Sequence, residues 1–109
     1  DGDPLDVLVI MDQPAYIGCL IECRMLGVVT AIQREKNGDK ARNDRFVAIA
    51  ASSILYKDIK NVKELNKNLV EEIENFFIDY NKHKGKKFQP NEWLNKGKAM
   101  KIIKKAVID

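Results

Sequence analysis

Residues 17–33 resemble one long strand that is interrupted near its middle, and few small folds have room for such a strand. Between Cys19 and Met25, apolar side chains recur at every second position, so they share one face of a strand. Gly27 follows, where a strand can bend, and the apolar residues 28–32 continue it. A long strand that bends at a glycine is what a small curled β-barrel requires.

Two shorter runs predict the strands that flank it. Residues 6–10 are mostly apolar, follow a Gly/Pro turn and predict a buried strand. Residues 45–50 predict the strand that returns after the turn signal Asn-Gly-Asp at 37–39. We therefore expect all strands to lie within residues 6–56.

Two helices are expected in the last part of the chain, over about residues 64–82 and 93–107. The first has apolar side chains at spacings of three and four, and Gly85 lies where it should stop: Leu65, Leu69, Ile73, Phe76, Phe77 and Tyr80. The second is expected to turn four apolar residues inward and lysines outward: Ala99, Ile102, Ile103 and Ala106. The class is therefore α+β, in one domain over residues 1–109.

Composition excludes several other classes of protein. Hydrophobic residues make up 45% of the chain and charged residues 32%, which suits a packed core and argues against global disorder. No apolar run approaches the roughly 20 residues that cross a bilayer, and the first residues lack the pattern of a signal peptide, so we expect a cytoplasmic protein with no membrane partner. Cys19 and Cys23 are expected to be buried and reduced, and with the single His83 they leave no zinc-type ligand set.

The net charge of +3 is unevenly distributed along the chain. Residues 1–33 carry one base and five acids, whereas residues 82–109 carry nine bases and two acids. The two segments are either two sides of one site for metal ions and anions or two solvated surfaces, and the charge pattern alone leaves both open.

The first six residues, Asp1-Gly2-Asp3-Pro4-Leu5-Asp6, place three carboxylates close together. Gly2 permits a tight turn and Pro4 fixes φ, so the loop is expected to be stiff. Carboxylates that converge from a rigid loop make the all-oxygen site that Mg²⁺ prefers. The alternative is a simple turn whose acids point into water.

The segment Asp-Gly-Asp-Pro-Leu-Asp-Val at residues 1–7 resembles, residue for residue, the signature of the family I soluble inorganic pyrophosphatases. Residues 18–29 resemble the long barrel strand of that family, and residues 58–65 its approach to the first helix. Residues 76–86 resemble the end of that helix and the loop beyond it. The resemblance thus extends over essentially the whole chain, in the order that the family has.

This resemblance implies a small, highly curved OB-like β-barrel with two C-terminal helices packed outside it. Because the family has a further segment before the signature, the barrel is expected to be incomplete on its N-terminal side. The implied activity is hydrolysis of pyrophosphate to two phosphates by metal-activated water, with several Mg²⁺ ions, or Mn²⁺ as the alternative. Asp1, Asp3 and Asp6 would be metal ligands, and Asp3 would also be catalytic, as the partner of the attacking water.

The substrate-binding residues follow from the same resemblance. Arg45 stands where the family has a phosphate-binding lysine, and Tyr80 matches a phosphate ligand that Lys82 or Lys84 would support. Asp44 would be a further metal ligand if the preceding loop bulges; otherwise its neighbour Asn43 takes that place.

One departure from the family pattern supports a second interpretation. Gln33 stands where the family has a metal-binding aspartate, and a neutral carboxamide is a poorer ligand for a hard dication. The alternative to the enzyme is therefore a catalytically degenerate, pyrophosphatase-like subunit with a binding or structural role. Relatives in the family assemble, so a homo-oligomer is expected. No nucleic-acid partner is expected, because Phe46 is the aromatic residue that the strands offer for stacking.

Overall fold

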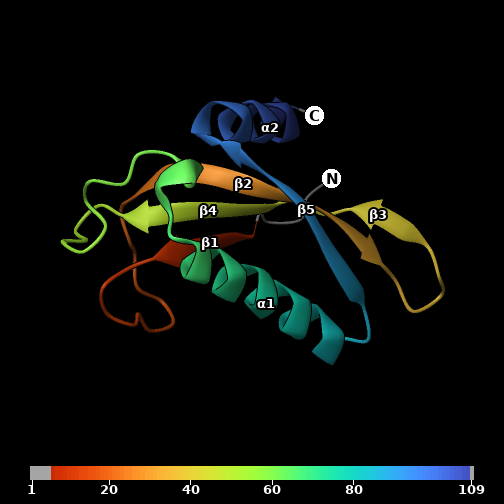
Figure 1. Ribbon diagram of the computed structural model, residues 1–109. Coiled ribbons are helices and arrows are strands. Elements are labelled where there is room, and N and C mark those ends of the chain that lie inside the picture. The colour runs from red at the N-terminus through yellow and green to blue at the C-terminus, as the bar shows by residue number, and fades with distance from the viewer. Residues whose placement is uncertain (1–5, 109) are drawn as a thin grey trace.

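The computed structural model describes residues 6–108, and it describes side chains for residues 6–105. Within these residues it has five strands, one short 3₁₀ turn and two α-helices (Figure 1). In chain order they are β1 (Val7–Ile10), β2 (Cys23–Arg34), β3 (Lys40–Arg42), β4 (Arg45–Ala50), η1 (Val62–Glu64), α1 (Lys67–His83), β5 (Lys87–Asn95) and α2 (Lys96–Ile108). The predicted α+β class is confirmed.

The strands form one open, mixed sheet in the order β1-β4-β2-β3, with β5 on the other side of β2. β1 runs parallel to β4, and the other pairs are antiparallel. β2 pairs with β4 through its first half and with β5 through its second half. Within residues 6–108 the sheet does not close into a barrel, as expected for a barrel that is incomplete.

Gly27 lies where β2 shifts register against β4, between Met25 and Gly27. A Cβ atom at this position would lie 2.3 Å from the carbonyl oxygen of Leu94 on β5 and 2.5 Å from Cγ1 of Val62. The absence of a side chain therefore lets β5 and η1 approach β2, in addition to easing the bend that the sequence predicts.

The two helices lie on opposite faces of the sheet (Figure 1), and a hydrophobic core lies under each of them. Neighbouring residues of a strand point to opposite faces, so Val28 and Val29 on β2 belong to different cores. Val29 packs in the core that contains Ile73 and Phe77 of α1. Val28 packs in the smaller core that contains Ala99 of α2.

The helix α1 begins three residues later than predicted. Asn66 caps it, since the side chain of Asn66 accepts a hydrogen bond of 2.7 Å from the amide of Leu69. Ile73 and Phe77 are buried as predicted, but Phe76 and Tyr80, which the predicted stripe also contained, are 51% and 45% exposed. The helix ends before Gly85, whose φ of +74° is the left-handed conformation that terminates many helices.

The second helix was predicted from residue 93 and all strands within residues 6–56, and both predictions are wrong. Residues 87–95 form β5, which pairs along β2, and α2 begins at Lys96. Pro90 makes this strand hard to predict from the sequence, because proline cannot donate a hydrogen bond to a neighbouring strand. The structure tolerates it at a register shift opposite Val29 and Ala31. Trp93 on β5 packs against the core under α1, and its Nε1 donates a hydrogen bond of 2.9 Å to Oε2 of Glu74.

The start of the long strand also differs from the prediction. Residues 17–22, which were predicted to begin the long strand, are not in the sheet, and a turn closes at Gly18, whose φ is +92°. Ile17 and Leu20 are fully exposed, Cys23 is exposed and Cys19 is half-buried, so the expectation of two buried cysteines is wrong. Alternation alone did not distinguish an ordered loop from a strand. Among the described residues, no helix is long and apolar enough to cross a bilayer.

Candidate active site

Three of the residues predicted for the site line one cavity of about 230 Å³. Asp6 lies just before β1, Arg45 begins β4, and Tyr80 is in the last turns of α1. β1 and β4 run parallel, with Val7 opposite Phe46, and this pairing brings the first two residues together. Asp1 and Asp3 lie outside the described residues.

Arg45 is the centre of this cluster, and its side chain is only 5% exposed. Its guanidinium pairs with the carboxylate of Asp6 and lies 5.7 Å from the ring centroids of both Phe77 and Phe88. Burial lowers the pKa of Arg45 from its ordinary value, but an arginine keeps its charge at physiological pH. Within residues 6–105 its Nε has no hydrogen-bond partner. The cluster therefore holds a fixed cation with a free donor between aromatic walls.

Two neutral carboxamides lie beside Arg45. Nδ2 of Asn43 donates a hydrogen bond of 2.6 Å to Oε1 of Gln33, and Nη2 of Arg45 lies 3.5 Å from the same oxygen. Gln33 is buried. At both positions the resemblance implies a metal-binding aspartate, which this sequence replaces with a carboxamide. In the structure the two carboxamides form a hydrogen bond with each other.

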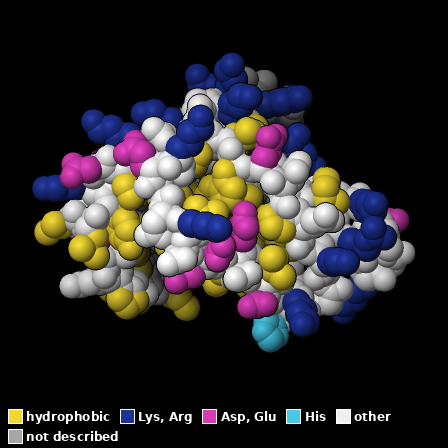
Figure 2. Space-filling model, viewed as in Figure 1, with side chains coloured by type: hydrophobic (Ala, Val, Ile, Leu, Met, Phe, Trp, Pro, Cys, Tyr) yellow, Lys and Arg dark blue, Asp and Glu magenta, His cyan; other side chains and the backbone are white. Residues whose placement is uncertain are grey.

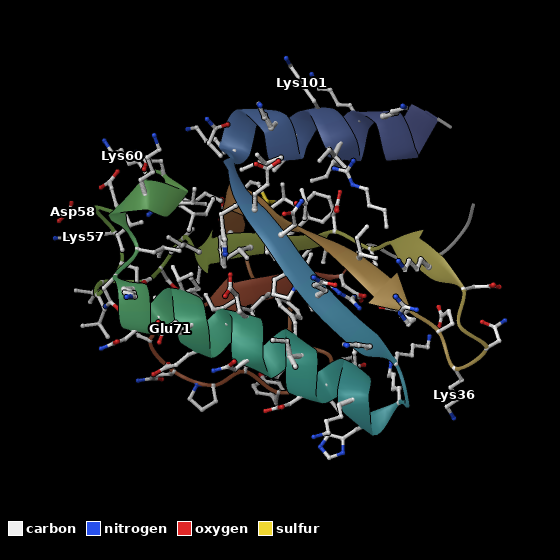
Figure 3. All side chains as sticks on the ribbon, turned by 45° about the vertical axis from the view of Figure 1, so that its right-hand side comes forward. Lys36, Lys57, Asp58, Lys60, Glu71 and Lys101 are labelled. Carbon is white, nitrogen blue, oxygen red and sulfur yellow. The ribbon has the colours of Figure 1, made fainter. Side chains whose placement is uncertain are left out.

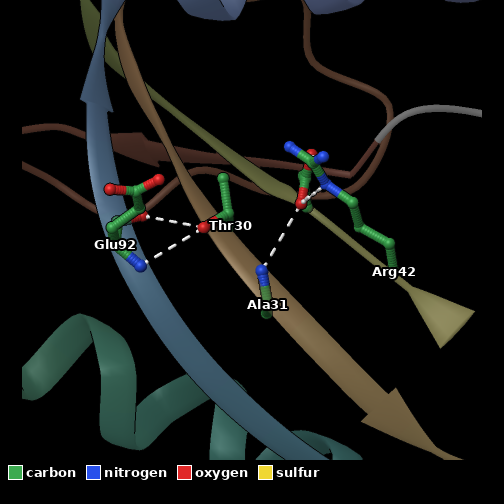
Figure 4. A network of polar contacts seen from close by, with 5 residues as sticks. Thr30, Ala31, Arg42 and Glu92 are labelled. Atoms are coloured by element: carbon green, nitrogen blue, oxygen red, sulfur yellow. Dashed lines mark hydrogen bonds and ion pairs between the residues drawn. The ribbon is translucent and has the colours of Figure 1, made fainter. Parts of the chain in front are cut away.

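Asp44 does not join the cluster. Its Oδ1 accepts from the backbone amide of Ala31 at 3.4 Å, and both of its oxygens accept from Nε of Arg42 at 3.0 Å (Figure 4). The reason is the alternation of side chains, because Asn43 and Arg45 both turn toward Gln33 and the residue between them points away. Of the two predicted alternatives, Asn43 takes the place near the cluster.

The network around Asp44 ties β2 to its neighbours. Asp44 raises the pKa of Arg42, chiefly through their hydrogen bond. Thr30 is the residue before Ala31 on β2. Its hydroxyl donates a hydrogen bond of 3.3 Å to the backbone carbonyl of Glu92 on β5 and accepts one of 3.2 Å from the backbone amide of Glu92 (Figure 4). These contacts give Asp44 a structural role.

Tyr80 and Lys84 meet because they are four residues apart at the end of α1. The ammonium of Lys84 lies 4.4 Å from the centroid of the Tyr80 ring. Lys84 lowers the pKa of the Tyr80 phenol, first by hydrogen bonding and then by its charge, and Arg45 lowers it further. Of the two lysines predicted beside Tyr80, Lys84 makes the contact, and Lys82 is exposed.

The described residues do not by themselves form a metal site. Among residues 6–108, no three His, Cys, Asp or Glu side chains are close enough to hold a metal ion. Asp6 supplies a carboxylate to the cluster, but Arg45 neutralises it, and Gln33 and Asn43 are uncharged. What the described cluster can do alone is bind an anion, through Arg45, Lys84 and the hydroxyl of Tyr80.

The sequence did not predict the aromatic walls of the site. Phe77 was assigned to the core stripe, and Phe88 was in the segment whose strand was not recognised. The signal for Phe88 is its position three residues after the helix-ending Gly85, where a buried aromatic residue can begin a new strand along the helix it has just left.

Comparison with known proteins gives consistent matches. A family model described as inorganic pyrophosphatase matches residues 1–109. Soluble inorganic pyrophosphatase 5 of Arabidopsis thaliana is 37% identical over 103 residues, which are 94% of this chain and 45% of that protein. The inorganic pyrophosphatase of Halalkalibacterium halodurans is 33% identical over 103 residues, 94% of this chain and 60% of that protein.

A solved structure shares the fold. The inorganic pyrophosphatase of Helicobacter pylori superposes with a TM-score of 0.79 at 25% identity, over 98% of this chain and 62% of that chain. The chain spans about half the length of the first curated relatives that it matches.

Proposed function

The chain belongs to the inorganic pyrophosphatase family, and on that basis we propose that this protein hydrolyses inorganic pyrophosphate to two phosphates. The observation that carries the proposal is the match of the family model to all 109 residues. The cavity that joins Asp6, Arg45 and Tyr80 supports it, because it gathers residues for anion binding at the predicted place.

In this proposal, Arg45, Tyr80 and Lys84 bind the phosphate groups. The planar guanidinium of Arg45 can donate to two phosphate oxygens at once, and the aromatic rings on both sides fix its orientation. Lys84 adds a second positive charge, and the hydroxyl of Tyr80 donates a further hydrogen bond. The site would thus bind and orient the substrate with groups that are already in place.

The carboxylates of Asp1, Asp3 and Asp6 would hold divalent cations, with Mg²⁺ as the first candidate and Mn²⁺ as the alternative. Such cations, when bound, neutralise charge on the phosphates and lower the pKa of water. Asp3 would accept a proton from the attacking water. Arg45 must then share Asp6 with a cation, which makes the Asp6–Arg45 pair the part of the site that has to rearrange when metal binds.

The experiment that tests the proposal measures phosphate release from pyrophosphate with and without Mg²⁺. Release that requires Mg²⁺ and is lost in Asp3→Ala supports it. The matched control is Asp58→Ala, since Asp58 is an exposed carboxylate in the loop at the far end of the molecule from the β2–β3 hairpin (Figure 3). Equal release from the Asp3→Ala variant and the wild type would contradict the proposed role of the acidic loop.

A second candidate function is a degenerate subunit that binds phosphates without hydrolysing them. The hydrogen bond between Gln33 and Asn43 favours it, because two neutral side chains that bond to each other lie beside Arg45. The test is the double variant Gln33→Asp with Asn43→Asp. If the wild type is inactive and the double variant stays inactive while folded, the degenerate subunit is the better assignment; activity in the double variant would show that these two positions alone had silenced an enzyme.

Assembly and location are also proposals. We propose a homo-oligomer, because within residues 6–108 the apolar strand β1 pairs on one side only, and a cytoplasmic location, because curated relatives are named soluble.

A further inference from the structure

A groove of about 530 Å³ lies on the face of the sheet opposite the candidate active site, beyond the end of α2. It is formed by the end of β2, by β3 and by the first part of β5, and its lining includes four cationic side chains: Arg34, Lys40, Arg42 and Lys87. Neither the proposed reaction nor the site around Arg45 uses these residues. Figure 2 shows Lys and Arg side chains gathered at the end of the molecule that carries β3.

Strand register aligns three of these cations in one row. Arg34 on β2 is directly opposite Lys40 on β3 and directly opposite Lys87 on β5. Directly opposed residues lie on the same face, with Cβ atoms about 5 Å apart, and like charges in that relation are destabilising. The fold therefore maintains an unfavourable row of three positive charges.

The described residues do not neutralise this row. Within residues 6–105, no carboxylate forms an ion pair with Arg34, Lys40 or Lys87. Of the nearby acids, Glu35 pairs with Lys86 at 3.4 Å and Asp44 pairs with Arg42, while the charge of Glu92 acts on Arg42, which is outside the row. A bound anion would supply the missing negative charge.

The next positions along the groove supply hydrogen-bonding groups and a floor. Gln89 and Asn91 on β5 are exposed amides that line the same groove, and Ile32 and Pro90 form its apolar part. Neighbouring strands are about 4.8 Å apart, so the Cα atoms of Lys40 and Lys87 are about 10 Å apart across β2. Side chains rooted that far apart can contact several phosphate groups of one small molecule.

We propose that this groove binds a small anion that carries a chain of phosphate groups, at a site separate from the candidate active site. The two sites are on opposite faces, since Gln33 lies between Ile32 and Arg34 on β2 and turns its side chain toward Arg45. Arg34, Lys40 and Lys87 bind the phosphates, and the amides of Gln89 and Asn91 orient them. Binding in the groove requires no divalent cation, because the row itself carries the positive charge.

The test is calorimetric titration of the intact protein with inorganic tripolyphosphate, in the presence of a chelator. We expect the Kd to rise at least about tenfold in the double variant Arg34→Gln with Lys87→Gln, because two charge-assisted contacts are lost. The matched control is Lys57→Gln with Lys60→Gln, which removes the same charge; Figure 3 shows both lysines at the opposite end of the molecule from Lys36 on the β2–β3 hairpin. The control should change the Kd less than about twofold.

Further variants test whether a loss of affinity comes from the groove itself. Tripolyphosphate can also bind at the cluster around Arg45, so the titration is fitted with two sites; Lys84→Gln should weaken that second site and leave the Kd of the groove unchanged. The groove variants should melt at or above the temperature of the wild type, because they remove repulsion; if the double variant does not fold, Lys40→Gln on the edge of the groove replaces it. The proposal is overturned by three results: no binding to the wild type, equal weakening in the control pair, or weakening in Lys84→Gln but not in the groove variants.

Discussion

At the scale of single residues, the site is built from charges that modify one another. Arg45 is buried against Phe77 and Phe88 and neutralises Asp6, while Lys84 acts on Tyr80 from the end of the same helix. The Asp6–Arg45 pair follows from the pairing of β1 with β4, and the Tyr80–Lys84 pair follows from the end of α1. Each can therefore be probed separately.

The first residue-scale prediction concerns Tyr80. Lys84 holds the pKa of the Tyr80 phenol below its ordinary value, so Lys84→Ala should raise that pKa, whereas Lys84→Arg should keep most of the shift. The measurement is an alkaline titration of phenolate absorbance, with the curve of Tyr80→Phe subtracted to isolate this tyrosine. Lys82→Ala is the control and should leave the curve in place. An unchanged titration curve in Lys84→Ala would contradict the effect of Lys84 on the Tyr80 phenol.

The second concerns Asp12, which joins two loops. Its carboxylate accepts hydrogen bonds from the hydroxyl of Ser53 at 2.6 Å and from the amide of Ile54 at 2.8 Å, and these lower its pKa. A carboxylate with a folded pKa below its unfolded value stabilises the fold above the unfolded value, and this contribution is lost as the pH falls through the folded value.

Asp12→Asn should therefore lower the Tm at neutral pH, and its difference from the wild type should shrink as the pH falls below about 4. Thermal unfolding followed by circular dichroism at neutral and acidic pH measures this difference. Asp58→Asn, at an exposed position, serves as the control and should behave like the wild type at both. A difference for Asp12→Asn that grows in acid would contradict the assignment.

At the scale of elements, β2 is the central strand of the fold. It pairs with three other strands and supplies residues to both cores. Gly27 is its most sensitive position, since the space of a methyl group is already occupied by the carbonyl of Leu94 and a methyl of Val62.

Gly27→Ala should therefore lower the free energy of unfolding by about 1–3 kcal/mol, as overpacking does. The matched control is Gly97→Ala in α2, where an added Cβ would lie 3.5 Å from Oδ1 of Asn95, an ordinary contact. That change should raise the free energy of unfolding by about 0.5–1 kcal/mol, because alanine favours a helix. Denaturant unfolding of both variants measures the two effects. Equal stability in the two variants would mean that β5 moves freely away from Gly27.

The sequence could predict the features that arise between residues close in the chain, but not those that arise between distant segments. The stripe of α1, its glycine stop and the Tyr80–Lys84 pair arise between residues close in the chain, and they were predictable. β5 was not, because Pro90 and its polar neighbours form a strand only in partnership with β2. The site shows the same limit: whether Asn43 or Asp44 faces Gln33 depends on the register between distant strands, which no local pattern reveals.

At the scale of the whole molecule, the two edges of the sheet differ. Within residues 6–108, β1 and β5 each pair on one side only. β5 is protected as an edge, since it carries Lys87, Pro90 and a register shift. β1 consists of Val7, Leu8, Val9 and Ile10 and has no such protection.

We therefore predict that the chain self-associates through β1. Val7, which is 42% exposed, is the position to change, and Val7→Lys should shift the population toward monomer, since a charge on an edge strand opposes pairing. Sedimentation velocity over a range of concentrations measures this shift. The matched control is Ile54→Lys, at an exposed apolar residue in a loop. A wild type that is monomeric at every concentration, or an equal effect of both variants, would show that β1 is not the contact.

The pairing of β2 with β5 has a consequence for biosynthesis. β5 joins the sheet through residues 87–95, whereas its partner positions on β2 are residues 27–34. While the chain is being made, β2, β4 and α1 emerge first, and one side of β2 stays without a partner until residue 95 has left the ribosome. During that interval one edge of β2 is unpaired and apolar residues are partly exposed to solvent. Chaperones bind chains in this state, and such chains are prone to aggregate. A ribosome stalled before residue 87 should therefore carry a chaperone-bound nascent chain, and one stalled well beyond residue 95 should carry a folded one.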